Sequence, residues 1–166
     1  MRRTAKLVAV AATAAAMAGW SAAAGAAETL ADQKVDGTII VGDSTCTWSD
    51  ADTSANPPDS LTIDRDSVNP PGGNLTCSGD ITATLNNDPA MDFDDAAGTA
   101  TADLVDITAQ QSFVSCRYQA TDVMWDRQGT ARDYANRSFT AGLVSGGFLC
   151  PSSQTINTGD ATLSFH

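Results

Sequence analysis

The chain has 166 residues, of which 42% are hydrophobic and 17% are charged, with 20 acidic residues against nine Lys and Arg. Its length is that of one domain. A formal net charge of −11 repels nucleic-acid phosphates and anionic membrane surfaces, so the composition argues against both as partners.

The N-terminus has the pattern of a secretory signal peptide. Arg2, Arg3 and Lys6 precede a run of small and apolar residues at 7–19, and small residues suited to cleavage follow up to residue 27. This run is shorter than the roughly 20 residues of a membrane-spanning helix, so we expect no membrane insertion. The sequence predicts a cleaved segment at 1–27 and one secreted, extracellular domain at 28–166. Cleavage leaves six basic residues against 20 acidic ones, a net charge near −14.

Apolar and polar residues alternate repeatedly in the predicted domain. A period of two with one apolar side predicts half-buried antiparallel strands. Pro, Gly, Asn and Asp clusters separate them as turn signals. The sequence therefore predicts an all-β fold, an antiparallel sandwich or a small barrel, because strand order cannot be read from it. We expect about eight strands, at residues 38–41, 60–63, 81–85, 100–104, 114–118, 122–126, 139–143 and 161–165.

The four cysteines suggest two disulfides and an internal pseudo-repeat. An even number of cysteines in an exported chain favours disulfides over a metal site. Cys46 and Cys116 each stand two residues before an aromatic residue, and a Gly-Gly pair followed by Leu precedes both Cys77 and Cys150. If one unit is written twice, the pairs are Cys46–Cys77 and Cys116–Cys150. The alternative is chance similarity in a chain rich in Gly, Thr, Ser and Asp.

A short acidic segment is the candidate metal site. Asp88, Asp92, Asp94 and Asp95 place four carboxylates within eight residues. Calcium takes six to eight oxygen ligands, so this segment could hold it, although the spacing is not that of an EF-hand loop. The alternative is a solvated acidic loop between two strands. We expect no other cofactor.

A second segment combines arginines with aromatic residues. Arg127, Arg132 and Arg137 recur every five residues near Trp125 and Tyr134. Arginine and large aromatic residues are enriched at interaction hot spots. The segment is therefore a candidate binding surface, and the alternative is a hairpin with solvated arginines.

Catalytic motifs are weak. His166 is the only histidine and the last residue, where we expect a frayed terminus, so a Ser-His-Asp or Cys-His arrangement has little support. A pair of aspartates could still serve a small hydrolase. The sequence favours a protein that is not an enzyme.

Residues 115–165 carry a resemblance. This part of the chain resembles a group of uncharacterised small secreted proteins of high-GC actinobacteria, through the stretch SCRY, the run GGFLCPSS and the closing GDATLSF. The Ala-rich leader is similar to the leaders of the same group. The resemblance implies export and β structure, and it implies no active site.

Together these features predict a secreted, non-catalytic binding or interaction module with a protein or small-molecule partner. Two alternatives stay open: a calcium-stabilised surface protein, and a small hydrolase that uses paired aspartates.

Overall fold

The computed structural model describes residues 33–166, and the predicted signal peptide at 1–27 lies outside them. The described chain consists of β-strands and one 3-10 turn, η1 (Arg65–Ser67), which confirms the predicted all-β class. The strands are β1 (Lys34–Val41), β2 (Ser44–Asp52), β3 (Leu61–Thr62), β4 (Asn74–Cys77), β5 (Ile81–Leu85), β6 (Ala90–Asp94), β7 (Thr99–Gln111), β8 (Val114–Arg127), β9 (Asp133–Asn136), β10 (Phe139–Gly146), β11 (Ser153–Ile156) and β12 (Ala161–Phe165).

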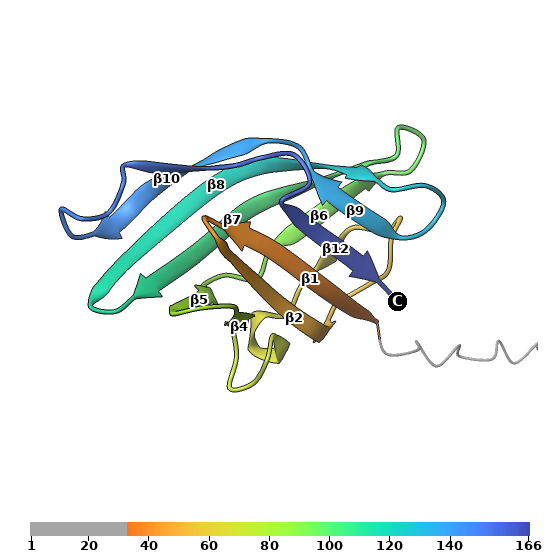
Figure 1. Ribbon diagram of the computed structural model, residues 1–166. Coiled ribbons are helices and arrows are strands. Elements are labelled where there is room, and N and C mark those ends of the chain that lie inside the picture. Colours follow the sequence, from red (N-terminus) through yellow and green to blue (C-terminus); the bar gives the residue numbers. More distant parts are fainter. Residues whose placement is uncertain (1–32) are drawn as a thin grey trace, which may run out of the picture.

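Eight strands close into an antiparallel barrel, which decides between the sandwich and the barrel. The order around the barrel is β8-β9-β12-β1-β2-β4-β5-β7, and the β7–β8 pairing closes the ring. Strands β10 and β11 continue the sheet from β8, outside the ring, and β6 and β3 continue it from β7. The tips of the β7–β8 and β10–β11 hairpins lie at one end of the molecule, and the C-terminus lies at the other (Figure 1).

The long β7–β8 hairpin organises the barrel because each of its strands changes its outer partner midway. Strand β8 pairs with β10 at residues 116–119 and with β9 at residues 125–127. Strand β7 pairs with β6 at residues 99–102 and with β5 at residues 107–111. The half of the hairpin next to β5 and β10 therefore forms one end of the barrel.

The residues of β8 that face the core change midway from even-numbered to odd-numbered positions. Cys116, Tyr118 and Ala120 are buried, and after one step out of alternation Val123 and Trp125 are buried. Asp122 lies between the two sets with a φ of 53°, which interrupts the pleat. The two strands expected at 114–118 and 122–126 are thus one strand with an irregular residue in its middle, and the prediction of two strands is wrong.

The core fills the barrel with side chains that the alternation predicts. Ala161, Leu163 and Phe165 are buried along β12. The ring of Phe165 makes edge-to-face contacts with Phe93 and Tyr134, at centroid distances of 5.7 and 5.9 Å. Such aromatic pairs stabilise a core beyond the area that they bury.

Both predicted disulfides are confirmed, and they join the chain in different ways. Cys46 and Cys77 are directly opposite each other on β2 and β4. Cys116 on β8 pairs with Cys150, which lies in the loop after β10. Gly146 faces Cys116 there, and a Cβ on it would stand 2.5 Å from Cys150 Sγ. The strand pairing around the two disulfides therefore differs between the two similar sequence units.

Within residues 33–166, no helix has the length and apolar character needed to cross a membrane.

Candidate functional site: an apolar pocket at one end of the barrel

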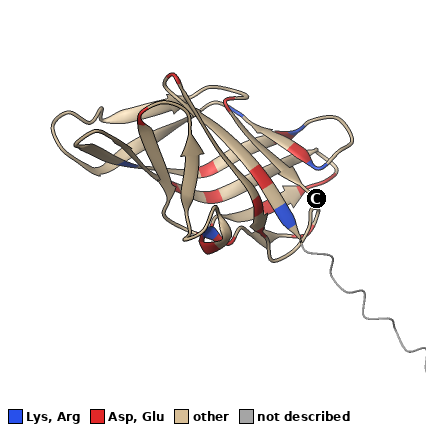
Figure 2. Cartoon of the chain, turned by 60° about the horizontal axis from the view of Figure 1, so that its bottom comes forward, with Lys and Arg blue, Asp and Glu red and all other residues tan. Residues whose placement is uncertain are grey.

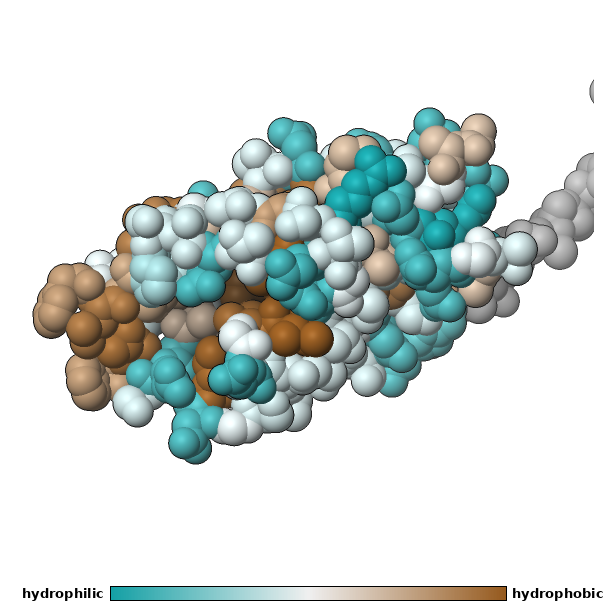
Figure 3. Space-filling model, turned by 45° about the horizontal axis from the view of Figure 1, so that its top comes forward, coloured by the Kyte–Doolittle hydropathy of each residue, from teal (hydrophilic) through white to brown (hydrophobic). Residues whose placement is uncertain are grey.

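A pocket of about 410 Å³ opens at the end of the barrel where the β7–β8 and β10–β11 hairpins lie. Apolar side chains gather at this end and border a hollow (Figure 3). We call it the mouth pocket. Its lining residues are Val41, Ile81, Ala109, Gln111, Ser112, Phe113, Val114, Cys116, Tyr118, Leu149, Pro151 and Gln154.

The rim of the mouth pocket exposes large apolar side chains. Phe113 is 88% exposed at the tip of the β7–β8 hairpin, and Phe148 and Leu149 are 97% and 52% exposed in the loop after β10. These three residues also line an adjoining hollow of about 310 Å³. Clustered apolar exposure beside a concave surface is typical of a binding site and unusual elsewhere on a soluble protein.

Local structure holds the rim residues in place. Ser112, with a φ of 53°, and Phe113 form the two-residue turn between β7 and β8. The loop after β10 is tied to β8 by the Cys116–Cys150 disulfide and by the hydroxyl of Tyr118, which donates to the Pro151 carbonyl at 3.1 Å. The rim is therefore anchored to the barrel wall by covalent and hydrogen bonds.

Two smaller cavities continue the mouth pocket into the barrel. The middle cavity, of about 40 Å³, shares part of its lining with the mouth pocket, and the inner cavity, of about 50 Å³, shares part of its lining with the middle one. The residues common to the mouth pocket and the middle cavity are Val41, Ala109, Tyr118 and Gln154. Those common to the middle and inner cavities are Ile39, Val105, Ile107 and Phe139. The three spaces therefore follow one another from the rim to the core.

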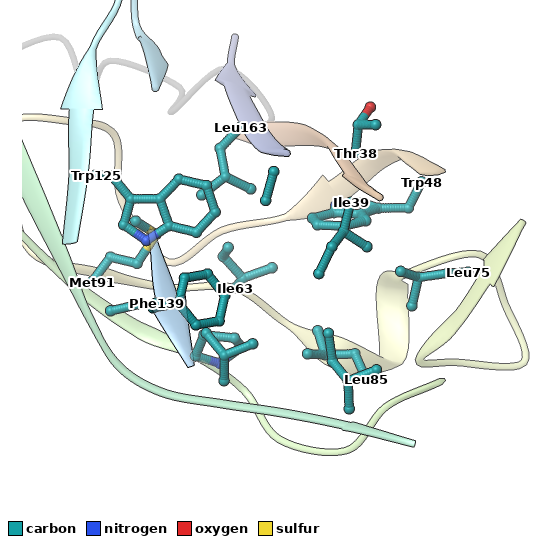
Figure 4. A pocket seen from close by; sticks show the side chains of 15 residues that line it. Thr38, Ile39, Trp48, Ile63, Leu75, Leu85, Met91, Trp125, Phe139 and Leu163 are labelled. Carbon is teal, nitrogen blue, oxygen red and sulfur yellow. The ribbon is translucent and has the colours of Figure 1, made fainter. Parts of the chain in front are cut away.

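The inner cavity contains two tryptophans with unused hydrogen-bond donors. Trp48 and Trp125 both line it, together with aliphatic side chains and Phe139 (Figure 4). The indole N–H groups of both are buried, and neither has a hydrogen-bond partner among the described residues. The Trp48 ring lies on Gly37 of the facing strand, where a Cβ would stand 1.9 Å from the ring. Glycine at position 37 is what makes room for this ring.

Among residues 33–166, no charged residue lines the mouth pocket or the two cavities. The polar side chains of the mouth pocket are neutral, namely Gln111, Ser112, Gln154 and the Tyr118 hydroxyl. The tips of the β7–β8 and β10–β11 hairpins carry no charge either (Figure 2). Charged residues of both signs stand next to lining residues in the sequence, since Asp80 precedes Ile81 and Arg117 lies between Cys116 and Tyr118. The site is thus apolar inside and neutral, with hydrogen-bonding groups at the mouth.

The structure separates the aromatic residues of the predicted arginine surface from its arginines. Trp125 and Tyr134 are only 6% and 3% exposed, so both rings belong to the core and not to a surface. Burial also raises the pKa of Tyr134. The expectation that these rings face a partner is therefore wrong, because the strands carrying them turn this side toward the barrel interior.

The arginines of the same segment are engaged by aspartates. Arg127 forms an ion pair with Asp95, and Arg137 pairs with Asp126 through two hydrogen bonds of 2.9 and 2.7 Å. Arg132 is exposed. Binding of a partner by these arginines stays a prediction, and it would have to compete with the two ion pairs.

The four aspartates of the predicted calcium site do not converge. All four side chains are exposed, and among residues 33–166 their carboxylates form no group of three that could share an ion. Each carboxylate has a different partner: Asp88 accepts from the Arg65 amide, Asp92 from the Ser60 hydroxyl and Asp94 from the Ala97 amide, while Asp95 pairs with Arg127. Asp92 and Asp94 lie on the extended strand β6, with Asp88 before it and Asp95 in the turn after it, and their separate partners correct the predicted calcium cluster.

A different acidic group does converge at the other end of the barrel. Asp36, Asp50 and His166 offer ligand atoms that lie within 4.8 Å of one another. His166 is not frayed as expected, because its backbone exchanges two hydrogen bonds of 3.0 Å with Lys34. Its Nε2 atom lies 3.4 Å from Asp50 Oδ1. The sequence did not indicate this group, since its members are brought together only by the β12–β1–β2 pairing.

Sequence reasoning also missed a buried carboxylate. Asp106 on β7 is only 2% exposed, and Arg117, Gln119 and Asn86 donate hydrogen bonds of 2.5–2.9 Å to it. These donors, above all Arg117, lower the pKa of Asp106 to about 2. Its neighbours Val105 and Ile107 line the cavities, so along an alternating strand Asp106 lies on the opposite face. The network therefore supports the barrel wall from outside and does not reach the pocket.

No family model, curated protein or solved structure matches this chain. The mouth pocket is therefore assigned on its geometry alone. A sequence signal for it existed in hindsight: Phe113 and Phe148 are bulky apolar residues placed inside turns, where polar residues are usual.

Proposed function

We propose that this chain is a secreted, non-catalytic binding protein that takes up a small apolar molecule through the mouth pocket. The observation that carries the proposal is the coincidence of a concave, uncharged pocket with exposed Phe113, Phe148 and Leu149 at its rim. The leader pattern and the two disulfides support an extracellular location.

The pocket has the properties of a small-molecule site. Its volume of about 410 Å³ falls in the range of known ligand pockets, roughly 300–1,000 Å³. It sits at the mouth of a β-barrel, a frequent place for such sites, and it combines apolar walls with a few neutral hydrogen-bonding groups. Two disulfides hold the barrel in shape, so the ligand meets a preformed surface, which lowers the entropic cost of binding.

The alternatives from the sequence have less support. A calcium-stabilised protein would need converging carboxylates, and those of Asp88, Asp92, Asp94 and Asp95 bind separate partners. A hydrolase would need a pair of carboxylates in a cleft, and in the described part of the chain no carboxylate lines the mouth pocket. A melting temperature that rises in millimolar calcium would restore the first alternative.

Binding of Nile red, a neutral dye that fluoresces in apolar surroundings, tests the proposal. The mature protein should bind it, and Phe113→Ser with Phe148→Ser should weaken binding by about tenfold, because each buried aromatic contact contributes on the order of 1 kcal/mol. Val144→Ser is the matched control, since Val144 is 51% exposed on β10 and lines none of these spaces. Its affinity should equal that of the parent.

Both variants should keep the parent's melting temperature, because the substituted side chains are exposed. A parent protein that does not bind the dye, or a double variant that binds it as well as the control does, would contradict the proposed site.

A further inference from the structure

We infer that the ligand is a neutral single-chain amphiphile, with its polar head in the mouth pocket and its aliphatic tail in the middle and inner cavities. This inference rests on the proposed function and specifies its ligand. It follows from the order, the size and the charge of the three spaces. The fluorescence of the two tryptophans that line the inner cavity provides the measurement.

The three spaces form an elongated path along β7. Gln111 lines the mouth pocket, Ala109 lines both the mouth pocket and the middle cavity, Ile107 and Val105 line both inner spaces, and Ala102 lines only the inner cavity. From residue 111 to residue 102 a strand extends about 30 Å, at 3.3 Å for each residue. A long, thin ligand fits such a path, and a globular one does not.

The path is much smaller beyond the mouth pocket than in it. The middle and inner cavities measure about 40 and 50 Å³, whereas an engineered protein cavity that binds benzene measures roughly 150 Å³. Ring systems therefore stay in the mouth pocket, and only an unbranched chain can enter the narrow part. Apolar walls on every side of the narrow part favour a hydrocarbon chain over a polar one.

The charge of the site selects a neutral head group. A carboxylate head in the mouth pocket would find no basic side chain among the described residues of its lining. A cationic head would find no carboxylate in the lining to pair with. Burying an unpaired charge is costly, whereas a hydroxyl or carbonyl head can bond with Gln111, Ser112 or Gln154.

The tail ends near natural fluorophores. Trp48 and Trp125 are the two tryptophans of the described residues, and both line the inner cavity. Trp20, the remaining tryptophan, falls within the predicted signal peptide. A quencher carried at the tail end should therefore reduce the fluorescence of the mature protein when the tail is seated.

The experiment compares three long-chain probes of equal length, each carrying a single bromine atom as the quencher at the end of its unbranched tail: an alcohol, a carboxylic acid and an ammonium. We expect the alcohol to quench tryptophan fluorescence with an affinity at least about tenfold higher than that of either charged probe. The comparison uses the unchanged mature protein, so it does not depend on any variant folding. Equal or tighter binding of a charged probe overturns the inference.

A blocking variant tests the path. Ala141→Phe places a ring in the middle cavity, because Ala141 lines that cavity and not the mouth pocket, so quenching by the alcohol probe should be lost while Nile red still binds at the mouth. Ala135→Phe is the control, because Ala135 is a partly buried residue of β9 that lines none of the three spaces. Unchanged quenching in Ala141→Phe overturns the inference.

The outcomes separate the two proposals. If Nile red binds at the rim and no chain probe quenches the tryptophans, the proposed function stands and the chain-like ligand is wrong. If neither Nile red nor any chain probe binds, the proposed function itself fails, and this inference fails with it.

Discussion

Single residues of this protein show how a polar group can be buried without joining a site. Asp106 has almost no solvent exposure, yet every donor around it comes from the outer face of the barrel. A buried carboxylate of this kind is stable only when it is fully paired, and removing it leaves its partners unsatisfied. The pKa of Asp106 is about 2, below its ordinary value of 3.8, because Arg117 and the two amide side chains favour the ionised form.

This pKa makes the stability of the protein depend on pH in a defined direction. A carboxyl whose pKa is lowered by folding stabilises the native state above its ordinary pKa and loses that contribution as the pH falls through its folded pKa. We therefore expect the Asp106 network to contribute about 1–2 kcal/mol at neutral pH, allowing for solvent around Arg117, and to lose this between about pH 4 and 2.

Urea denaturation of Asp106→Asn at several pH values measures this contribution. The variant should be less stable than the parent at pH 7, and the difference should shrink toward pH 2. Asp126→Asn is the matched control, because Asp126 pairs with Arg137 in an ion pair whose two side chains are both well exposed. Asp126→Asn should change little, and a parent–variant difference for Asp106→Asn that is independent of pH would contradict the role given to this carboxyl.

At the scale of structural elements, the two disulfides have different roles. Cys46–Cys77 joins neighbouring strands inside the barrel wall, whereas Cys116–Cys150 fixes the loop that carries Phe148 and Leu149. Both close loops of similar length, 31 and 34 residues, so their effects on the unfolded chain should be alike, roughly 3–4 kcal/mol each.

Removal of either disulfide should therefore lower the stability by a similar amount, whereas only removal of Cys116–Cys150 should weaken ligand binding. Replacing Cys116 and Cys150 with Ser frees the rim loop and should weaken Nile red binding severalfold at a temperature where the protein stays folded. Replacing Cys46 and Cys77 with Ser should lower the melting temperature by a similar amount and leave affinity unchanged. Equal affinity in both double variants would show that the rim loop does not depend on its disulfide.

On the scale of the whole molecule, charge and apolar surface are segregated. Sixteen of the 20 acidic residues precede residue 107, and the hairpin tips at the pocket end carry no charge (Figure 2). A predicted net charge near −14 keeps copies of the protein apart in solution despite the exposed rim, and it also opposes compaction through self-repulsion.

Self-repulsion predicts that salt stabilises this protein. Raising the ionic strength from 0.01 to 0.15 M shortens the Debye length from about 30 to 8 Å, so the melting temperature followed by circular dichroism should rise. Replacing exposed Asp59 and Asp122 with Asn should reduce that rise, because it removes two negative charges. A melting temperature that falls with added salt would mean that the ion pairs outweigh the repulsion.

Part of this architecture follows from local sequence. Alternation at residues 81–85 and 161–165 predicted strands with the correct buried side, because a period of two in a strand directly encodes one apolar face. The similar segments around the cysteines, interpreted as an internal repeat, predicted both disulfide pairs. Short strands such as Asp133–Asn136 and Ser153–Ile156 escaped prediction, since their polar composition is typical of loops and only pairing with neighbours makes them strands.

The site residues show where local sequence stops being informative. Trp125 and Tyr134 have the composition of a binding surface, and the fold turns both rings into the core. Four aspartates close in sequence were spread along an extended strand, whereas Asp36, Asp50 and His166 meet although 130 positions separate the first from the last. Composition says which chemistry is available, and strand pairing decides which side chains meet.

The sequence by itself determined the strand class, the presence of two disulfides and the acidic character, because these depend on short-range periodicity, cysteine number and residue counts. Only the tertiary structure decided that the sheet closes into a barrel, that Phe113 and Phe148 share one rim, and that an apolar path runs from them to Trp48 and Trp125. Each of these depends on the pairing of strands far apart in the chain. Such pairing is set by how the whole core packs and not by any one segment.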